Sequence, residues 1–420
     1  MFRTLLLRPR GPRLTRAFTS QMDPNHLTAT QLEVRAAITK LCSPYPDSYW
    51  ADRDRTETYP HELHRDLSRD GWIGISLPPS LGGAGLGIAE AAVMLQTISE
   101  SGAGMAGAQS VHANIYATQP VSKFATPAQQ AEYLTPLING TARTCFGVTE
   151  PNSGLDTLSL TTTATRDGDT YRISGTKIWI TNAQIADTMV LLARTAAPPD
   201  TPAQKCLSLF YIPLNRADPG LTIKKIPKMG ARAVDANEVF FDNYAIPASC
   251  RIGAEGEGFK IVLHGMNAER ILVGAEALGL GYAALNKAVT YARERVVFGR
   301  TIGRNQGIQH PLAKVWMQLE AAKLAVYNAA EVYDAVERGE REVGRTEVGA
   351  MAGMGKFLAA EAAWESCERA VLTLGGMGYA QEFHVERYLR ECLVPKIAPV
   401  SREMVLGFVA EKVLGLEKSY

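Results

Sequence analysis

The sequence lacks an excess of charge of either sign, and it lacks any long hydrophobic run. It has 44 basic and 43 acidic residues, a formal net charge of +1, and no block of like charges. Nucleic acids and anionic membranes bind clustered positive charge, so neither is expected as a partner. No apolar run approaches the roughly 18 residues that a membrane-spanning helix needs, and no membrane span is predicted.

Several metal-binding and catalytic signatures are missing as well. The cysteines form no C-x-x-C pair and the histidines form no H-x-x-x-H pair, so no metal site is expected. There is no P-loop for nucleotide phosphates and no G-x-S-x-G elbow of a serine hydrolase. The six scattered cysteines are predicted to be reduced and mostly buried thiols. They are Cys42, Cys145, Cys206, Cys250, Cys367 and Cys392.

The N-terminal segment departs from this balanced composition. Residues 1–20 contain five arginines and no acidic residue, and the first acid is Asp23. An arginine-rich, acid-free and mildly amphipathic start is typical of a mitochondrial transit peptide. We therefore predict a leader over residues 1–22 and a location in the mitochondrial matrix. A basic tail without a targeting role is the alternative.

The middle of the chain separates a helical region from a β region. Residues 23–140 have helical periodicity, with a helix expected at 127–138 and Thr126 as its N-cap. In residues 141–255, the stretch 160–181 is rich in Thr, Ile, Tyr and Trp, and Asp167-Gly168 divides it with a hairpin signal. Further strands are predicted at 189–195, 206–214 and 239–247.

Helical periodicity returns in residues 256–420. One long helix is predicted from Gly256, followed by helices over 307–338 and 344–373. Long helices joined by short connections favour an antiparallel bundle. The predicted fold class is therefore α+β and multidomain, with an N-terminal helical domain, a middle β-barrel-like or sandwich domain and a C-terminal helical bundle. The pattern G-x-G-x-x-A over 279–284 lies inside a helix rather than after a strand, so it predicts helix packing and not a dinucleotide site.

Two segments of the middle region have the residue types of a ligand site. Residues 145–154 read CFGVTEPNSG and offer hydroxyls and turn N–H groups that can bind a heterocycle or a phosphate. Residues 177–182 read KIWITN and place an indole beside a hydroxyl at a strand end. Each segment alone is better explained as structural.

Three further stretches join these two in a fixed order: MGAR at 229–232, YARERVVFGR at 291–300 and LGGMGY at 374–379. The set, across an α, β, α layout, resembles the acyl-CoA dehydrogenase family of flavoproteins. The resemblance covers nearly the whole chain after the leader. It implies FAD as cofactor, an acyl-CoA thioester as substrate, and dehydrogenation of the Cα–Cβ bond.

The resemblance also implies which residues contact FAD. The residues expected at the flavin are Phe146, Val148, Thr149, Trp179 and Thr181. Arg295, Phe298 and Gln306 match positions that hold the adenine and pyrophosphate end, usually of a neighbouring subunit's FAD, which implies a homotetramer or a homodimer. Gly375 and Gly376 match a close backbone approach to the cofactor, and Ser401 matches a threonine that contacts it.

The catalytic base departs from the commonest family pattern. Most relatives place a glutamate in a loop after the last glycine motif, where this chain has Pro399. Isovaleryl-CoA and long-chain acyl-CoA dehydrogenases instead carry the base on the long C-terminal helix, immediately before an arginine, and this chain has Glu269-Arg270 there. Glu269 is therefore the predicted base. Glu403 is the nearest rival, and Glu150 is interpreted as structural.

At the substrate end, Arg270 matches a residue of the active-site wall near the CoA portion. Leu155 replaces a serine that often contacts the substrate, and Leu372 replaces a common glutamine near the cofactor, so the acyl group stays open. The predicted function is FAD-dependent α,β-dehydrogenation of an acyl-CoA, with electrons passed to electron-transfer flavoprotein. The alternatives are an acyl-CoA oxidase-like enzyme, a specialised dehydrogenase of secondary metabolism, and an inactive binding or assembly subunit.

Overall fold

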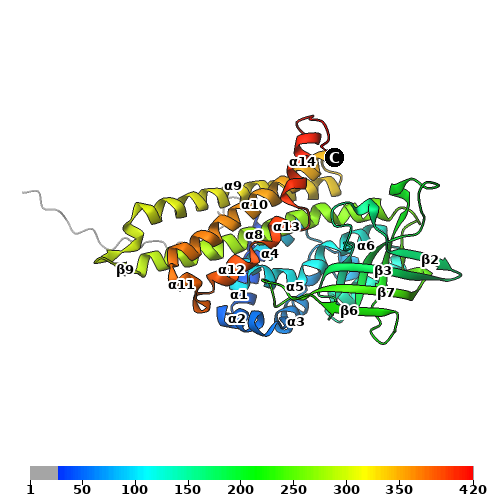
Figure 1. Ribbon diagram of the computed structural model, residues 1–420, viewed down its shortest axis with the longest axis horizontal. Coiled ribbons are helices and arrows are strands. Elements are labelled where there is room, and N and C mark those ends of the chain that lie inside the picture. The colour runs from blue at the N-terminus through cyan, green and yellow to red at the C-terminus, as the bar shows by residue number, and fades with distance from the viewer. Residues whose placement is uncertain (1–26, 420) are drawn as a thin grey trace, which may run out of the picture.

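The computed structural model describes residues 27–419 of the chain. The leader predicted for residues 1–22 lies outside the described residues. Figure 1 shows an elongated molecule, with a helical bundle along one half and a β domain at the other end. Within residues 27–419, no helix is both long and apolar enough to cross a membrane.

The N-terminal region is helical, as predicted. Its helices are α1 (Ala29–Cys42), α2 (Asp47–Thr56), α3 (His61–Arg69), α4 (Ile88–Ile98), α5 (Gly104–Tyr116), α6 (Thr118–Phe124) and α7 (Pro127–Ile138). Thr126 caps α7 as expected, because its side chain accepts a hydrogen bond from the Gln129 backbone and Gln129 returns one. α4 begins after Gly87, which has no side chain to cap it, and the Asp334 carboxylate accepts from the Ile88 and Ala89 backbones instead.

The middle region forms one sheet in the strand order β6-β7-β3-β2-β4-β5-β8, with β1 added in parallel to β4. The strands are β1 (Thr144–Gly147), β2 (Thr163–Asp167), β3 (Thr170–Thr181), β4 (Thr188–Arg194), β5 (Leu207–Pro213), β6 (Leu221–Lys225), β7 (Ala236–Pro247) and β8 (Arg251–Ile252). The predicted hairpin joins β2 to β3, where Asp167 pairs with Thr170. The short strands β1 and β6 were not among the predicted ones.

Three long helices build the C-terminal bundle: α8 (Gly258–Glu294), α9 (Gln306–Glu337) and α10 (Arg345–Leu374). A small hairpin of β9 (Val296–Val297) and β10 (Arg300–Thr301) joins α8 to α9 at the end of the bundle remote from the β domain (Figure 1). The short helices α11 (Gly376–Tyr379), α12 (Val385–Glu391) and α13 (Val394–Ile397) follow, and α14 (Arg402–Lys412) projects from the body.

The glycines of α8 pack helices together, as predicted. A Cβ at Gly279 would lie 2.3 Å from the Gln96 carbonyl oxygen of α4, and one at Gly281 would lie 2.7 Å from a methyl of Leu319 in α9. Only glycine allows the helices to approach this closely. The six cysteines are all free and buried, which confirms the expected thiols.

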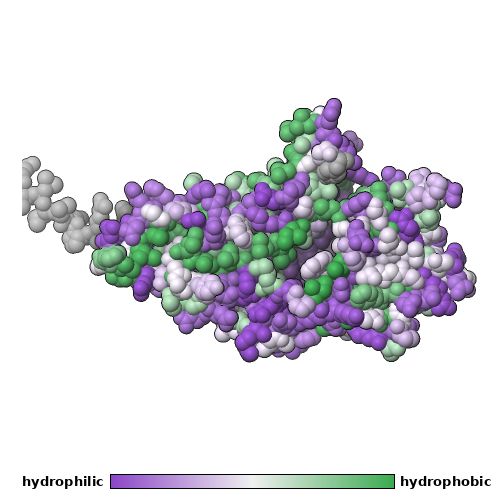
Figure 2. Space-filling view, in the orientation of Figure 1, coloured by the Kyte–Doolittle hydropathy of each residue, from purple (hydrophilic) through white to green (hydrophobic). Residues whose placement is uncertain are grey.

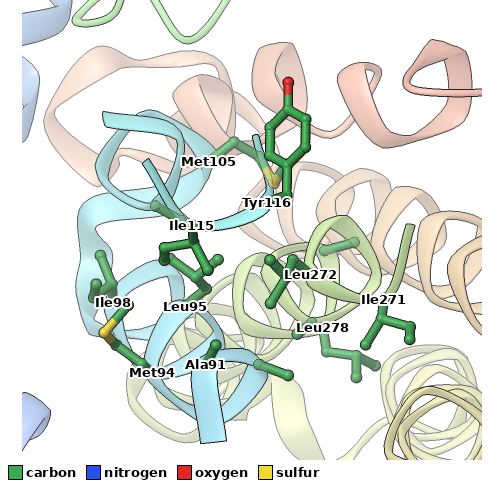
Figure 3. Close-up of a cluster of buried hydrophobic side chains, with 14 of the residues drawn as sticks. Ala91, Met94, Leu95, Ile98, Met105, Ile115, Tyr116, Ile271, Leu272 and Leu278 are labelled. Carbon is green, nitrogen blue, oxygen red and sulfur yellow. The ribbon is translucent and has the colours of Figure 1, made fainter. Parts of the chain in front are cut away.

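One apolar core joins the N-terminal helices to the bundle. Figure 3 shows side chains of α4, α5 and α8 packed together, including Leu95, Ile115 and Leu272, which are essentially inaccessible to solvent. The β domain has a separate core of its own. The Tyr116 hydroxyl points away from the apolar cluster (Figure 3), and the surface is hollowed where the bundle meets the β domain (Figure 2). Tyr116 is itself buried in this core, and its hydroxyl extends beyond the apolar side chains.

Candidate active site

Glu269 lies on α8, half-buried, with its carboxyl facing α5 and α10. Burial raises the pKa of this carboxyl to about 7, although His112, Arg270 and the nearby Tyr116 hydroxyl all act to lower it. A carboxyl with a pKa near the working pH can both accept and release a proton, which is what a general base requires. The predicted base therefore sits in an environment that suits the role.

A helix glutamate that merely pairs with its neighbour would look different. The Arg270 guanidinium donates to the Asn267 side chain at 3.0 Å, and within residues 27–419 it forms no salt bridge with Glu269. Burial lowers the pKa of Arg270, and the Glu269 charge partly offsets that effect. Glu269 is thus neither neutralised by Arg270 nor placed on a solvated helix face.

The loop that carries Pro399 lies beside the same part of α8. Lys356 of α10 is fully buried and donates to the Val400 carbonyl at 2.7 Å. Burial and Arg270 lower the pKa of Lys356 to about 8, while Glu269 opposes the shift. Arg270 and Val400 also line one pocket of about 50 Å³. The residues that follow Glu269 and Pro399 therefore line one pocket, and of these two predicted base positions only Glu269 has a carboxylate.

The two rival glutamates do not fit the role of base. The Glu403 side chain is 72% exposed and lies 3.5 Å from Arg402 on the surface of α14. Glu150 is buried, but its carboxylate pairs with Lys177 at 2.9 Å and accepts from the Thr161 and Thr162 backbones. Burial would raise the pKa of Glu150, but these partners lower it to about 2. A carboxylate this acidic and this fully bonded is structural.

The first group of predicted cofactor residues comes together at β1 and β3. Phe146, Val148 and Thr149 are half-buried at the end of β1. Lys177 donates to the Val148 carbonyl at 2.9 Å, and the Ile178 N–H donates to the Thr149 carbonyl at 2.9 Å. These bonds hold the two predicted flavin segments side by side.

Trp179 is displayed by an irregularity in β3. The register of β3 against β7 shifts between Lys177 and Ile180, and Trp179 adopts a φ of 62°. Its indole is 56% exposed, and Thr181 follows at the end of the strand, half-buried. A bulge and a positive φ at a non-glycine residue re-aim a side chain at the cost of local strain, which functional sites often contain.

An aromatic contact links the predicted flavin segments to the predicted base. The ring of Phe146 packs edge-on against Tyr116 with centroids 5.2 Å apart, and Tyr116 lies close enough to Glu269 for each to shift the other's pKa. The groups expected for cofactor binding and for proton abstraction therefore lie next to each other. Residues 27–419 contain no cluster of three or more side chains suited to a metal ion.

The remaining predicted residues lie elsewhere. Arg295, Phe298 and Gln306 are exposed at the far end of the bundle, so this chain does not bring them to Trp179. Among residues 27–419, nothing lies within 4 Å of a Cβ built at Gly375 or Gly376, and Gly375 has a φ of 63°, a value that favours glycine. Ser401 caps α14 by accepting from the Met404 N–H. Leu155 and Leu372 are both exposed.

Four residues around Glu269 were not among the predicted site residues: His112 and Tyr116 on α5, Glu276 on α8 and Lys356 on α10. Glu276 is fully buried and lies 2.7 Å from the Nδ1 atom of His112. The sequence contains one signal that could have predicted Glu276. It is a second carboxylate in the same apolar run as Glu269, two helical turns further on. The spacing of His112 and Tyr116 also places both on one face of a helix.

Three family models match the chain in order. They are the acyl-CoA dehydrogenase N-terminal domain over residues 28–141, the middle domain over 145–244 and the C-terminal domain over 256–414. An acyl-CoA dehydrogenase of Bacillus subtilis is 34% identical over 93% of this chain and 99% of its own length. The bovine mitochondrial short-chain specific acyl-CoA dehydrogenase is 34% identical over 88% of this chain and 86% of its own length.

Among solved structures, butyryl-CoA dehydrogenase of Megasphaera elsdenii superposes with a TM-score of 0.84 at 30% identity. The match covers 92% of this chain and 99% of that one. The fold and the site together define an FAD-dependent oxidoreductase. The chain belongs to the acyl-CoA dehydrogenase family, which confirms the predicted family and three-part fold.

Proposed function

We propose that the chain dehydrogenates the Cα–Cβ bond of an acyl-CoA thioester, with Glu269 as the base that takes the α-proton. The observation that supports this most directly is the half-buried Glu269 carboxyl, whose pKa is raised to about 7, beside a loop where Pro399 supplies no acid–base group. The Tyr116 hydroxyl lies near that carboxyl and helps to lower its pKa, and Arg270 lines the adjacent pocket.

The residues at β1 and β3 fit a flavin. Half-buried backbone and hydroxyl groups at Phe146, Val148 and Thr149 can bond a planar ring system, and the exposed face of Trp179 with Thr181 can cover it. When bound, FAD accepts the hydride equivalent from Cβ. The exposed Gly375 and Gly376 backbone and the Ser401 hydroxyl are proposed as further contacts.

The proposed FAD site includes residues of a neighbouring subunit. Arg295, Phe298 and Gln306 are exposed at the far end of the bundle, and no part of residues 27–419 covers the Phe298 side chain. We propose that they bind the FAD of a second copy in a homotetramer or homodimer. Electron-transfer flavoprotein is the proposed electron acceptor, and the arginine-rich start of the chain supports a place in the mitochondrial matrix.

A short acyl group is the proposed substrate class. The bovine relative is named as specific for short chains, and the Megasphaera elsdenii structure is named for butyryl-CoA. Leu155 and Leu372 stand exposed at positions expected near the substrate and cofactor, so they can alter the choice of acyl group. A branched short acyl group belongs in the same test.

Anaerobic titration of the flavin-loaded protein with acyl-CoAs of increasing length, straight and branched, tests the proposal. We expect short acyl-CoAs to bleach the oxidised flavin spectrum, and Glu269→Gln to abolish bleaching while the protein keeps its flavin. Glu403→Gln is the matched control and should bleach normally. A Glu269→Gln variant that is reduced at the parental rate would remove Glu269 as the base. Oxygen uptake during turnover would show that oxygen, and not electron-transfer flavoprotein, accepts the electrons.

A further inference from the structure

Four titratable side chains meet where α5 packs on α8. His112 and Tyr116 are one helical turn apart on α5, and Glu269 and Glu276 are two turns apart on α8. The two helices run antiparallel, because Tyr116 lies beside the Glu269 end and His112 beside the Glu276 end. The four groups therefore form one row along the interface.

The inner end of this row is a buried ion pair. His112 Nδ1 lies 2.7 Å from Glu276 Oε1, Glu276 is inaccessible to solvent, and His112 is only 8% exposed. Burial would lower the pKa of His112, but Glu276, and to a smaller degree Glu269, raise it overall. Buried pairs of this kind are often no more stabilising than apolar residues of the same size. Fold stability alone therefore gives no reason for a charged pair at this position.

The pair is connected to the base through Tyr116. The His112 ring lies 4.7 Å from the Tyr116 ring, and Tyr116 and Glu269 are close enough to shift each other's pKa. The other groups that face Glu269 are Arg270 from α8 and Lys356 from α10. After burial, His112 has the largest effect on the Glu269 carboxyl, ahead of both Arg270 and Tyr116.

We propose that the buried His112–Glu276 pair is a positioning device for the base, in which Glu276 holds a positive charge on His112 and this charge keeps Glu269 ionised. The proposal rests on the proposed role of Glu269. His112 and Glu276 act through Tyr116 and through space, and neither needs to touch the substrate.

The direction of the effect follows from the charges. Without Glu276, burial leaves His112 neutral near pH 7, and Glu269 loses its strongest electrostatic support. The Glu276 charge itself acts on Glu269 in the opposite sense, but more weakly than His112 does. The pKa of Glu269 should therefore rise in Glu276→Gln. It should rise further in His112→Gln, where a carboxylate remains without its counter-charge.

The test is the pH dependence of flavin reduction in a single anaerobic turnover with a short acyl-CoA. The rate of flavin reduction should fall at low pH, where Glu269 is protonated. In Glu276→Gln we expect this fall, the acid limb of the pH profile, to move to higher pH by about one unit. The rate at alkaline pH should stay within about threefold of the parent. Glu391→Gln is the matched control: Glu391 is also fully buried and paired with Arg387, but it faces the other end of α5. The control should melt at lower temperature with an unmoved limb.

A double variant keeps the test decisive if a single variant folds poorly. His112→Gln with Glu276→Gln removes both charges and leaves two amides that can bond each other. It should melt close to the parent and show the same limb shift. An unmoved limb in a folded Glu276→Gln or double variant, with Glu269→Gln inactive, overturns the positioning role alone. Parental reduction in Glu269→Gln overturns the proposed base instead.

Discussion

Removing the Lys177 charge is expected to destabilise the flavin segment severely. The Lys177 ammonium is fully buried and donates to Glu150 and to the Val148 carbonyl, both at 2.9 Å. Lys177→Met leaves the Glu150 charge buried without its counter-ion and the Val148 carbonyl without its donor. Loss of one partner of a buried ion pair costs about 3–5 kcal/mol in the free energy of unfolding.

Urea unfolding of the flavin-free protein measures this cost, and the ratio of flavin to protein absorbance measures cofactor retention. We expect Lys177→Met to lose both stability and flavin. Lys314→Met is the control, because Lys314 pairs with Glu365 at 2.7 Å on the surface, with 60% of its side chain exposed. Such a pair is worth below about 1 kcal/mol. A Lys177→Met protein that unfolds like the control would refute the reasoning.

The same pair predicts a loss of stability in acid. The pKa of Glu150 is about 2 in the folded protein and ordinarily 4.5, because Lys177 and the Thr161 and Thr162 groups outweigh the effect of burial. Its contribution is fully present above pH 4.5 and is lost as the pH falls toward 2, for a total of about 3 kcal/mol. In Lys177→Met the pKa of Glu150 rises, so this part of the acid dependence should shrink.

Two further variants test the framework and the cofactor site separately. Asp334→Ala removes the acceptor that caps α4 from another helix, at 2.9 Å from both backbone N–H groups, and should lower the free energy of unfolding by about 1–2 kcal/mol, with Asp334→Asn losing less. Trp179→Ala should weaken flavin binding at least tenfold while the flavin-free protein changes stability by less than about 1 kcal/mol, because the indole is 56% exposed. Equal losses of stability and of flavin would show that Trp179 is structural.

Much of the fold follows from local pattern. The change from helical periodicity to alternating strands near residue 141, and back near 256, predicted the order of helical and β regions because each period matches one kind of buried face. The capped helix α7 and the β2–β3 hairpin carry their own signals in Thr126 and in Asp167-Gly168. The strands β1 and β6 are only four and five residues long, too short for alternation to distinguish them from loops.

The candidate site divides in the same way. The order of five motifs along the chain predicted a flavin-dependent family, and the exchange of a loop glutamate for Pro399 directed attention to Glu269. No pattern along the chain joins His112 to Glu276, because their contact arises only when α5 packs against α8. Trp179 was expected at the flavin, but the exposure of its side chain depends on the register shift between β3 and β7.

The sequence by itself determined which residue types are available: carboxylates in an apolar helix, a proline at the position where the family resemblance implies a base, and two segments suited to a flavin. Tertiary structure decided how acidic those groups are, because a pKa depends on burial and on charges contributed by other elements. Glu269 and Glu150 are both glutamates of this chain, and their pKa values of about 7 and about 2 differ because burial prevails at Glu269 while Lys177 and hydrogen-bond donors prevail at Glu150. Packing of α5 and α10 on α8 makes Glu269 a candidate base. The contact of Lys177 with Glu150 makes Glu150 a structural anion.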